Sequence, residues 1–217
     1  MVKSNHIPFE DWVDWMFNRQ DDQWPWGDDR GLRSNWFRNN RLMAEHFIEL
    51  HRNSVKSLKD LTNFQIGNGL WNLYTAALGL SPLDGNGIHA KLHYEMIASL
   101  VPMLQQLLPE RVPHHEGYAN DRISDAVYMF WDSAPVSPFR KNHTDRELLD
   151  VCISEMQQAL NVKHPAAHKH ALHGLGEFHL DIPDRAKSII DEWLEQNPYV
   201  LDSIRNYAVK ARVGDVL

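Results

Sequence analysis

The stretch that decides the fold runs from Ala159 to Gly176 and reads ALNVKHPAAHKHALHGLG. A helical pattern ends near Leu160, and a four-residue connector leads to Pro165. Proline is typical of the first position of a helix, because its missing N–H has no intrahelical partner there. Apolar residues then recur with helical spacing at Ala167, Ala171, Leu175 and Phe178. Asn197-Pro198 stands 33 residues after the first such proline and is expected to open another helix, so the stretch predicts helices that stack on one another.

Helical spacing continues through nearly all of the other periodic segments. We expect helices over 8–17, 38–52, 60–78, 88–108, 121–132, 145–160, 165–178, 183–196 and 198–211. Pro102 is expected to kink the helix over 88–108 or to divide it in two. No run alternates between apolar and polar residues as a strand does. The predicted fold class is therefore all-α, with antiparallel helix pairs stacked as an array or as an irregular bundle.

The C-terminal third, from Leu148 to Leu217, resembles HEAT-like repeats. In that resemblance Ala167 takes the aliphatic position, His168 the basic position and Leu175-Gly176 the packing position after the proline. Val162 replaces the aspartate that often caps the connector, and the second copy at Pro198 has no Leu-Gly pair. The resemblance implies a binding surface built from stacked helix pairs. We expect one domain over 1–217, with N-terminal helices and an acidic Trp-rich loop in 1–60, central helices in 61–143 and the HEAT-like helices in 144–217.

Composition limits the functional classes. The chain has 217 residues, a formal net charge of −7 and a single cysteine, Cys152, which excludes an intramolecular disulfide and a cysteine-based zinc site. An acidic surface repels phosphate backbones, so nucleic-acid binding is not expected. The first residues carry early acids and no apolar signal region, and no run is long enough to cross a bilayer. We therefore expect a soluble cytoplasmic protein with no cofactor.

Histidine is the most prominent residue type in the decisive stretch. His164, His168, His170, His173 and His179 fall within sixteen residues. Pairs of histidines three or four positions apart can chelate a metal, but a site needs a third ligand. The interpretation that we favour is a polar helix face that uses histidine where other proteins use lysine or arginine.

A second set of histidines and carboxylates could form a metal site between helices. His89 and His93 are four residues apart, and His46 and Glu49 are three apart on another predicted helix. If the two helices were neighbours, these four residues would be the best candidate ligands of a metal-dependent enzyme. The sequence contains no Glu-x-x-His motif of the di-iron bundles, which weakens this alternative.

The stretch from Asp21 to Arg30 combines acidic residues with tryptophan. Tryptophan is over-represented at binding hot spots, so Trp24, Trp26, Asp28 and Asp29, together with His168, are the predicted binding residues. The alternative is that the two rings pack against the N-terminal core while the aspartates face water. The sequence favours a non-catalytic protein-binding or inhibitor-type function, with a protein partner that could be basic. A HEAT-like DNA glycosylase is a weaker alternative, because such proteins need a basic concave face.

Overall fold

The computed structural model describes residues 7–19, 39–74, 88–113, 121–133 and 146–216 of the chain. These residues form α-helices and the turns between them, with no β-strand among them, which confirms the predicted all-α class. The helices are α1 (Phe9–Phe17), α2 (Asn40–Arg52), α3 (Ser54–Ser57), α4 (Asn63–Tyr74), α5 (Ala90–Ala98), α6 (Leu100–Arg111), α7 (Arg122–Tyr128), α8 (Phe130–Ser133), α10 (Arg146–Leu160), α11 (Pro165–Glu177), α12 (Pro183–Gln196) and α13 (Asp202–Ala211).

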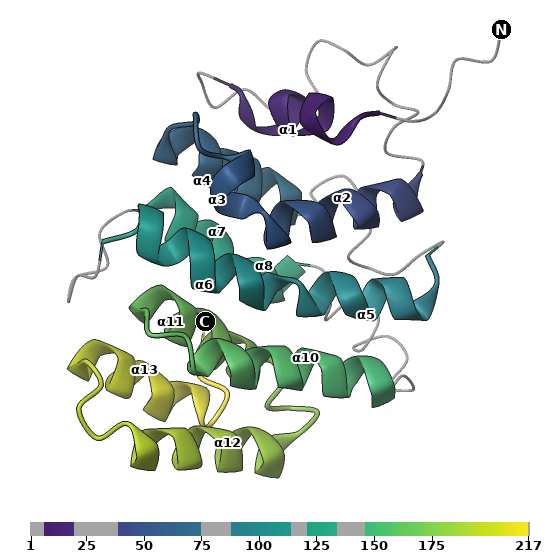
Figure 1. Ribbon diagram of the computed structural model, residues 1–217. Coiled ribbons are helices and arrows are strands. Elements are labelled where there is room, and N and C mark those ends of the chain that lie inside the picture. The colour runs from purple at the N-terminus through teal and green to yellow at the C-terminus, as the bar shows by residue number, and fades with distance from the viewer. Residues whose placement is uncertain (1–6, 20–38, 75–87, 114–120, 134–145, 217) are drawn as a thin grey trace, which may run out of the picture.

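The helices stack in successive layers from α1 to the pair α12 and α13 (Figure 1). In one column α2 packs on α5 and α6, and these two pack on α10. In the other column α4 packs on α7, α11 packs on α7 and α8, and α13 packs on α11. The Trp193 indole N–H on α12 donates to the carbonyl of Leu160 at the end of α10 (3.0 Å), which attaches α12 below the first column. Helices distant in sequence therefore meet side by side.

The start of α11 shows why the decisive stretch folds as it does. His164 is extended, and its Nδ1 accepts the backbone N–H of Ala166 at 3.2 Å, so a histidine performs the capping that serine or aspartate usually performs. The other ring nitrogen donates to the carbonyl of Val112, at the end of α6 (3.0 Å). Pro165 occupies the first helical position, as predicted. The buried side chain of His164 thus caps the start of α11 and attaches this helix to the end of α6.

Pro102 divides the predicted long helix in two. Proline cannot donate a hydrogen bond to the carbonyl four residues before it, so a helix running through this point would lose its bond to Ala98. Helix α5 ends at Ala98, and α6 begins at Leu100, which places the proline in the first turn of the new helix. The Ser99 hydroxyl donates to the carbonyl of Met96 at 2.6 Å in the break.

Pro198 does not open a helix, which corrects the prediction. Residues 198–200 form a turn, and α13 begins only at Asp202, after an extended Leu201. The guanidinium of Arg205 donates to the carbonyls of Asn197 and Pro198 at 3.2 and 2.7 Å, and these bonds hold the turn. The second copy of the repeat pattern is therefore shifted by one helical turn relative to the first.

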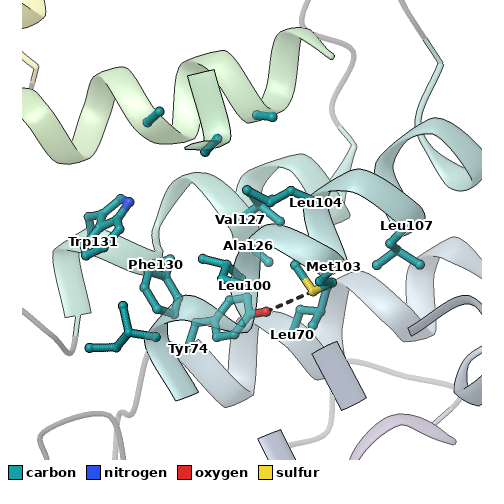
Figure 2. Packing of buried hydrophobic residues seen from close by; sticks show 14 of the residues in the cluster. Leu70, Tyr74, Leu100, Met103, Leu104, Leu107, Ala126, Val127, Phe130 and Trp131 are labelled. Carbon is teal, nitrogen blue, oxygen red and sulfur yellow. Dashed lines mark hydrogen bonds between the residues drawn. The ribbon is translucent and has the colours of Figure 1, made fainter. Parts of the chain in front are cut away.

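One hydrophobic cluster runs through the stack from Ile7 to Val216. Figure 2 shows its centre, where Leu70 and Tyr74 of α4 meet apolar residues of α6, α7 and α8. Gly174 of α11 allows a close approach in this region, since a Cβ at this position would lie 2.7 Å from the Trp131 ring. Small residues on α11 therefore set how near the layers can come.

The outer face of α12 is polar and ends the stack. Its exposed residues are Pro183, Asp184, Arg185, Lys187, Ser188, Glu192, Glu195 and Gln196. No further helix covers this face in the described part of the chain, and a polar outer face is typical of the terminal helix pair in stacked helical proteins. None of the helices in the described ranges is both long and apolar enough to cross a membrane.

Candidate functional site

The predicted recognition loop lies outside the described residues, and so do its four candidate residues, Trp24, Trp26, Asp28 and Asp29. The fifth predicted binding residue, His168, lies on α11 and is only partly exposed. Its ring packs edge-on against Trp193 of α12, with the ring centroids 5.1 Å apart. His168 therefore contributes to the contact between two helices in the structure.

The predicted metal ligands His46, Glu49, His89 and His93 lie on or beside neighbouring helices. Helices α2 and α5 are in contact, as that prediction required. The His46 Nε2–H donates to the carbonyl of Ile7 (3.0 Å), whereas Glu49 is exposed and His89 caps the N-terminus of α5. In the described part of the chain, a group of three residues with metal-ligand spacing is formed by different residues, on α8 and α11.

The histidines of α11 do not form the solvated polar face that the sequence suggested. His164, His170 and His173 are all buried, with at most 1% of each residue exposed. Each ring has specific partners on another helix, because a buried polar group without a hydrogen bond costs free energy. The histidines connect α11 to its neighbours in the stack.

His170 lies in a closed network inside the fold. Its Nδ1 donates to the carbonyl of Val127 at 2.9 Å. The Trp131 indole nitrogen lies 3.0 Å from the other ring nitrogen, Nε2. Both oxygens of Glu155 lie 3.2 Å from the same nitrogen, and neither the Glu155 nor the His170 side chain is exposed. Helices α7, α8 and α10 are thus joined to α11 at one imidazole with no access to solvent.

His173, one helical turn further along α11, lies at the surface end of a similar network. Its Nε2 is 2.9 Å from the Asp132 carboxylate on α8. Glu177 follows four residues later on the same face of α11, and one ligand atom of each of the three residues lies within 4.8 Å of the others. The His173 side chain is 2% exposed and that of Asp132 is 25% exposed, so the group opens towards solvent on the carboxylate side. We refer to these three residues as the α8–α11 cluster.

Tyr207, Tyr128 and Val216 form a chain of hydrogen bonds that leads to the His173 ring of the cluster. The Nδ1 of His173 is 2.9 Å from the hydroxyl of Tyr207 on α13. That hydroxyl is 3.0 Å from the hydroxyl of Tyr128, which donates to the carbonyl of Val216 at 3.2 Å. Burial raises the pKa of Tyr128, so its hydroxyl keeps its proton at neutral pH. The His173 ring is held on one nitrogen by these groups and presents the other to the carboxylates.

Further charged groups continue along the same side of α11. Lys169, one turn before His173, places its ammonium group 4.6 Å from the centre of the Tyr128 ring. Burial lowers the pKa of Lys169, and Asp125 nearby opposes that shift. The pKa of Asp125 is raised, by burial first and by Asp121 second. Ionisable groups with shifted pKa values therefore lie on the α7–α11–α13 side of the molecule, which is common at functional sites.

A different feature, exposed apolar side chains, marks the end of the stack. Leu180 in the α11–α12 turn is 90% exposed, and Val209 and Val213 on and after α13 are 57% and 62% exposed. A Cβ at Gly214 would lie 3.2 Å from the His179 side chain, so this turn and the end of α13 are neighbours. We call Leu180, Val209 and Val213 the C-terminal patch.

The α8–α11 cluster was missed from the sequence for a physical reason. His173 and Glu177 stand four residues apart on one helix, and that spacing is visible in the printed sequence. Asp132 comes from a separate segment, 41 residues before His173, and only the packing of α8 against α11 brings it near. The tyrosine that orients the ring lies 34 residues after it.

No protein-family model matches the sequence, and no curated protein and no solved structure is significantly similar to it.

Proposed function

We propose that the protein binds another protein through the end of its helical stack. The observation that supports this most directly is the C-terminal patch, where Leu180, Val209 and Val213 leave most of their apolar surface in water. Single exposed apolar residues are ordinary on protein surfaces, but a group of them at one site marks an interaction surface. Most other exposed side chains of α12 are polar, so this group stands out from that helix, and Tyr199 in the α12–α13 turn is a further exposed apolar side chain of the last layer.

Two acidic side chains beside the patch suit a basic partner, while the exposed Lys210 next to Val209 carries the opposite charge. Asp181 follows Leu180, and the exposed Asp215 comes two residues after Val213. The nearby Arg212 is paired with Asp191 through two hydrogen bonds of 2.6 and 3.0 Å, which also lowers the pKa of that carboxylate. The whole chain carries a net charge of −7. A partner with an apolar anchor and basic residues around it would complement this surface and be attracted to it over a distance.

The architecture supports the same proposal. Helix pairs stacked in two columns leave the turns and the last pair free to meet a partner, and the resemblance of the C-terminal third to HEAT-like repeats implies the same use. In this proposal the protein acts by binding, and it needs no cofactor, membrane or nucleic acid to do so.

The test compares proteins captured by the unaltered chain with those captured by two variants. Leu180→Asp/Val213→Asp places charge in the patch, and Tyr199→Asp does the same at the α12–α13 turn, where Tyr199 is 97% exposed. Quantitative mass spectrometry of the captured material should show at least one protein that is lost with the patch variant and retained with the Tyr199 variant. Titration calorimetry with that purified protein should then give weaker binding at higher salt, because opposite charges are screened.

Two results would refute the proposal. One is capture of the same proteins by the unaltered chain and the patch variant. The other is a sedimentation experiment in which the unaltered chain forms a dimer that the patch variant loses, since the patch would then bind a second copy of this chain. Circular dichroism of both variants confirms that they are folded, which the exposure of all three altered side chains leads us to expect.

A further inference from the structure

The α8–α11 cluster has the composition and spacing of a metal site, and this inference stands independently of protein binding. Asp132, His173 and Glu177 provide two carboxylates and one imidazole, with one ligand atom of each within 4.8 Å of the others. Ligand atoms around a tetrahedral zinc ion with bonds of about 2.0–2.2 Å lie roughly 3.3–3.6 Å apart. The 2.9 Å between His173 Nε2 and the Asp132 oxygen is a hydrogen-bond distance, and it would have to lengthen by only about half an ångström to reach that separation. Small side-chain rotations of the two carboxylates would bring the third ligand into place.

The buried histidine separates this cluster from an ordinary group of surface acids. Its Nδ1 faces the Tyr207 hydroxyl at 2.9 Å, and this fixes the orientation of the ring. When Nδ1–H donates to that hydroxyl, Nε2 presents a lone pair between the two carboxylates, as a metal-bound histidine does. Without a metal the ring takes the other tautomer, with Nε2–H donating to Asp132 and the Tyr207 hydroxyl donating to Nδ1. The same three positions therefore serve both states without a change in the backbone.

We propose that Asp132, His173 and Glu177 bind a divalent transition-metal ion, and that Zn²⁺ fits their donor set best. Imidazole nitrogen favours Zn²⁺ and its neighbours over Mg²⁺ and Ca²⁺, which prefer oxygen ligands alone. The two carboxylates balance the double positive charge of the ion. Three protein ligands leave a coordination position for water on the side where Asp132 is exposed, which is the arrangement of zinc sites that act on a substrate.

The experiment uses the full chain, purified without a histidine tag and freed of metal by dialysis against a chelator. Titration calorimetry and native mass spectrometry with Zn²⁺ should show one tightly bound ion per chain. Co²⁺ in place of Zn²⁺ should give visible absorption bands typical of four or five ligands, and an anomalous-difference map from crystals grown with Zn²⁺ should place the ion between the three side chains. Mg²⁺ should not compete.

Substitutions separate metal binding from a purely structural hydrogen bond. Asp132→Asn and Glu177→Gln should each weaken Zn²⁺ binding at least tenfold, because each removes a charged ligand. Tyr207→Phe should weaken it about 10- to 100-fold, the range typical of groups that orient a metal-bound histidine. The control variants His89→Asn and Glu192→Gln alter an exposed histidine and an exposed carboxylate elsewhere, and they should bind as the unaltered chain does.

The outcome distinguishes metal binding from a purely structural role of the cluster. If the unaltered chain binds no ion, or if Asp132→Asn and Glu177→Gln bind as tightly as the controls, the proposal is overturned and the cluster serves only to join α8 to α11. The thermal melting of each metal-free variant shows whether it is folded. Glu177→Gln is the decisive variant, because its side chain is partly exposed and is replaced by one of equal size.

Discussion

Acidification should destabilise this protein through His51, which is completely buried on α2. Burial lowers the pKa of its imidazole from 6.5 to about 3, so the ring stays neutral in the folded protein at every pH above that value. In the unfolded chain the same ring takes up a proton at about pH 6.5. Between these two values, acid stabilises the unfolded state and leaves the folded state unchanged.

The hydrogen bonds around His51 explain why it is neutral and which nitrogen carries the proton. The Ser99 hydroxyl gives its only proton to the carbonyl of Met96, at 2.6 Å. Its oxygen must therefore accept the proton of His51 Nδ1, at 2.9 Å. The remaining nitrogen, Nε2, accepts from the hydroxyl of Tyr74, also at 2.9 Å, because the other acceptor near that hydroxyl, the Met103 sulfur at 3.2 Å, is a weak one. Burial keeps the pKa of Tyr74 well above its usual value, so this donor is always protonated. The neutral ring satisfies all of its partners.

The size of the effect follows from the two pKa values. Between pH 6.5 and about pH 3, each unit by which the pH falls lowers the free energy of unfolding by about 1.4 kcal/mol. The stabilisation that the neutral His51 contributes to the free energy of unfolding is complete above pH 6.5. It is reduced by roughly 2 kcal/mol at pH 5 and is lost as the pH approaches 3. A loss of this size is a large fraction of the roughly 5–15 kcal/mol that stabilises a typical domain.

Urea denaturation at pH 7 and pH 5 measures this loss, and His51→Gln isolates it from the other buried histidines. The variant has no proton to gain at this position, so the unaltered chain should lose about 2 kcal/mol more than the variant between the two pH values. NMR provides a second measurement, because the His51 ring signals should not move between pH 7 and pH 4. Equal losses in the two proteins, or a His51 ring that titrates near pH 6, would refute the reasoning.

Substitutions at three further positions test the packing of α11. Gly174→Ala should lower stability by about 1–3 kcal/mol in urea, because its Cβ would lie 2.7 Å from the Trp131 ring in a packed core. His164→Ala should cost about 2–3 kcal/mol through the loss of a helix cap and a buried hydrogen bond, and His164→Asn should recover about 1 kcal/mol by restoring the cap alone. Glu155→Ala should lower the melting temperature far more than Glu155→Gln, because alanine leaves a cavity beside the buried His170 and glutamine keeps a hydrogen-bonding group there. Equal effects of the two Glu155 variants would contradict this account.

Much of the fold was predictable because helices depend on residues close together in sequence. Pro165 and Pro183 begin α11 and α12 where the sequence placed them, and Pro102 separates α5 from α6. The prediction was wrong at Pro198, where the chain makes a turn first. There the carbonyls bind to the guanidinium of Arg205, a bond formed across the turn that no local propensity reveals.

The roles of the histidines were the least predictable part. The sequence showed a dense group and suggested a polar face, but burial depends on what packs against a residue. His170 is buried because Trp131 and Glu155 close over it, and they lie 39 and 15 residues away. A pattern with helical period identifies one face of a helix as apolar, yet it does not show that the neighbouring faces are also covered.

The sequence by itself determined that this chain is built from α-helices, where most of them begin and end, and that α11 carries small residues suited to close packing. These properties depend on the spacing of apolar residues and on backbone chemistry within a few positions. Only the tertiary structure decided that His173 meets Asp132 and Tyr207, and that His179 comes near Gly214 after α13. These contacts join segments that lie tens of residues apart in the sequence. They form because stacking the helices in two columns buries apolar faces that no single helix could bury alone.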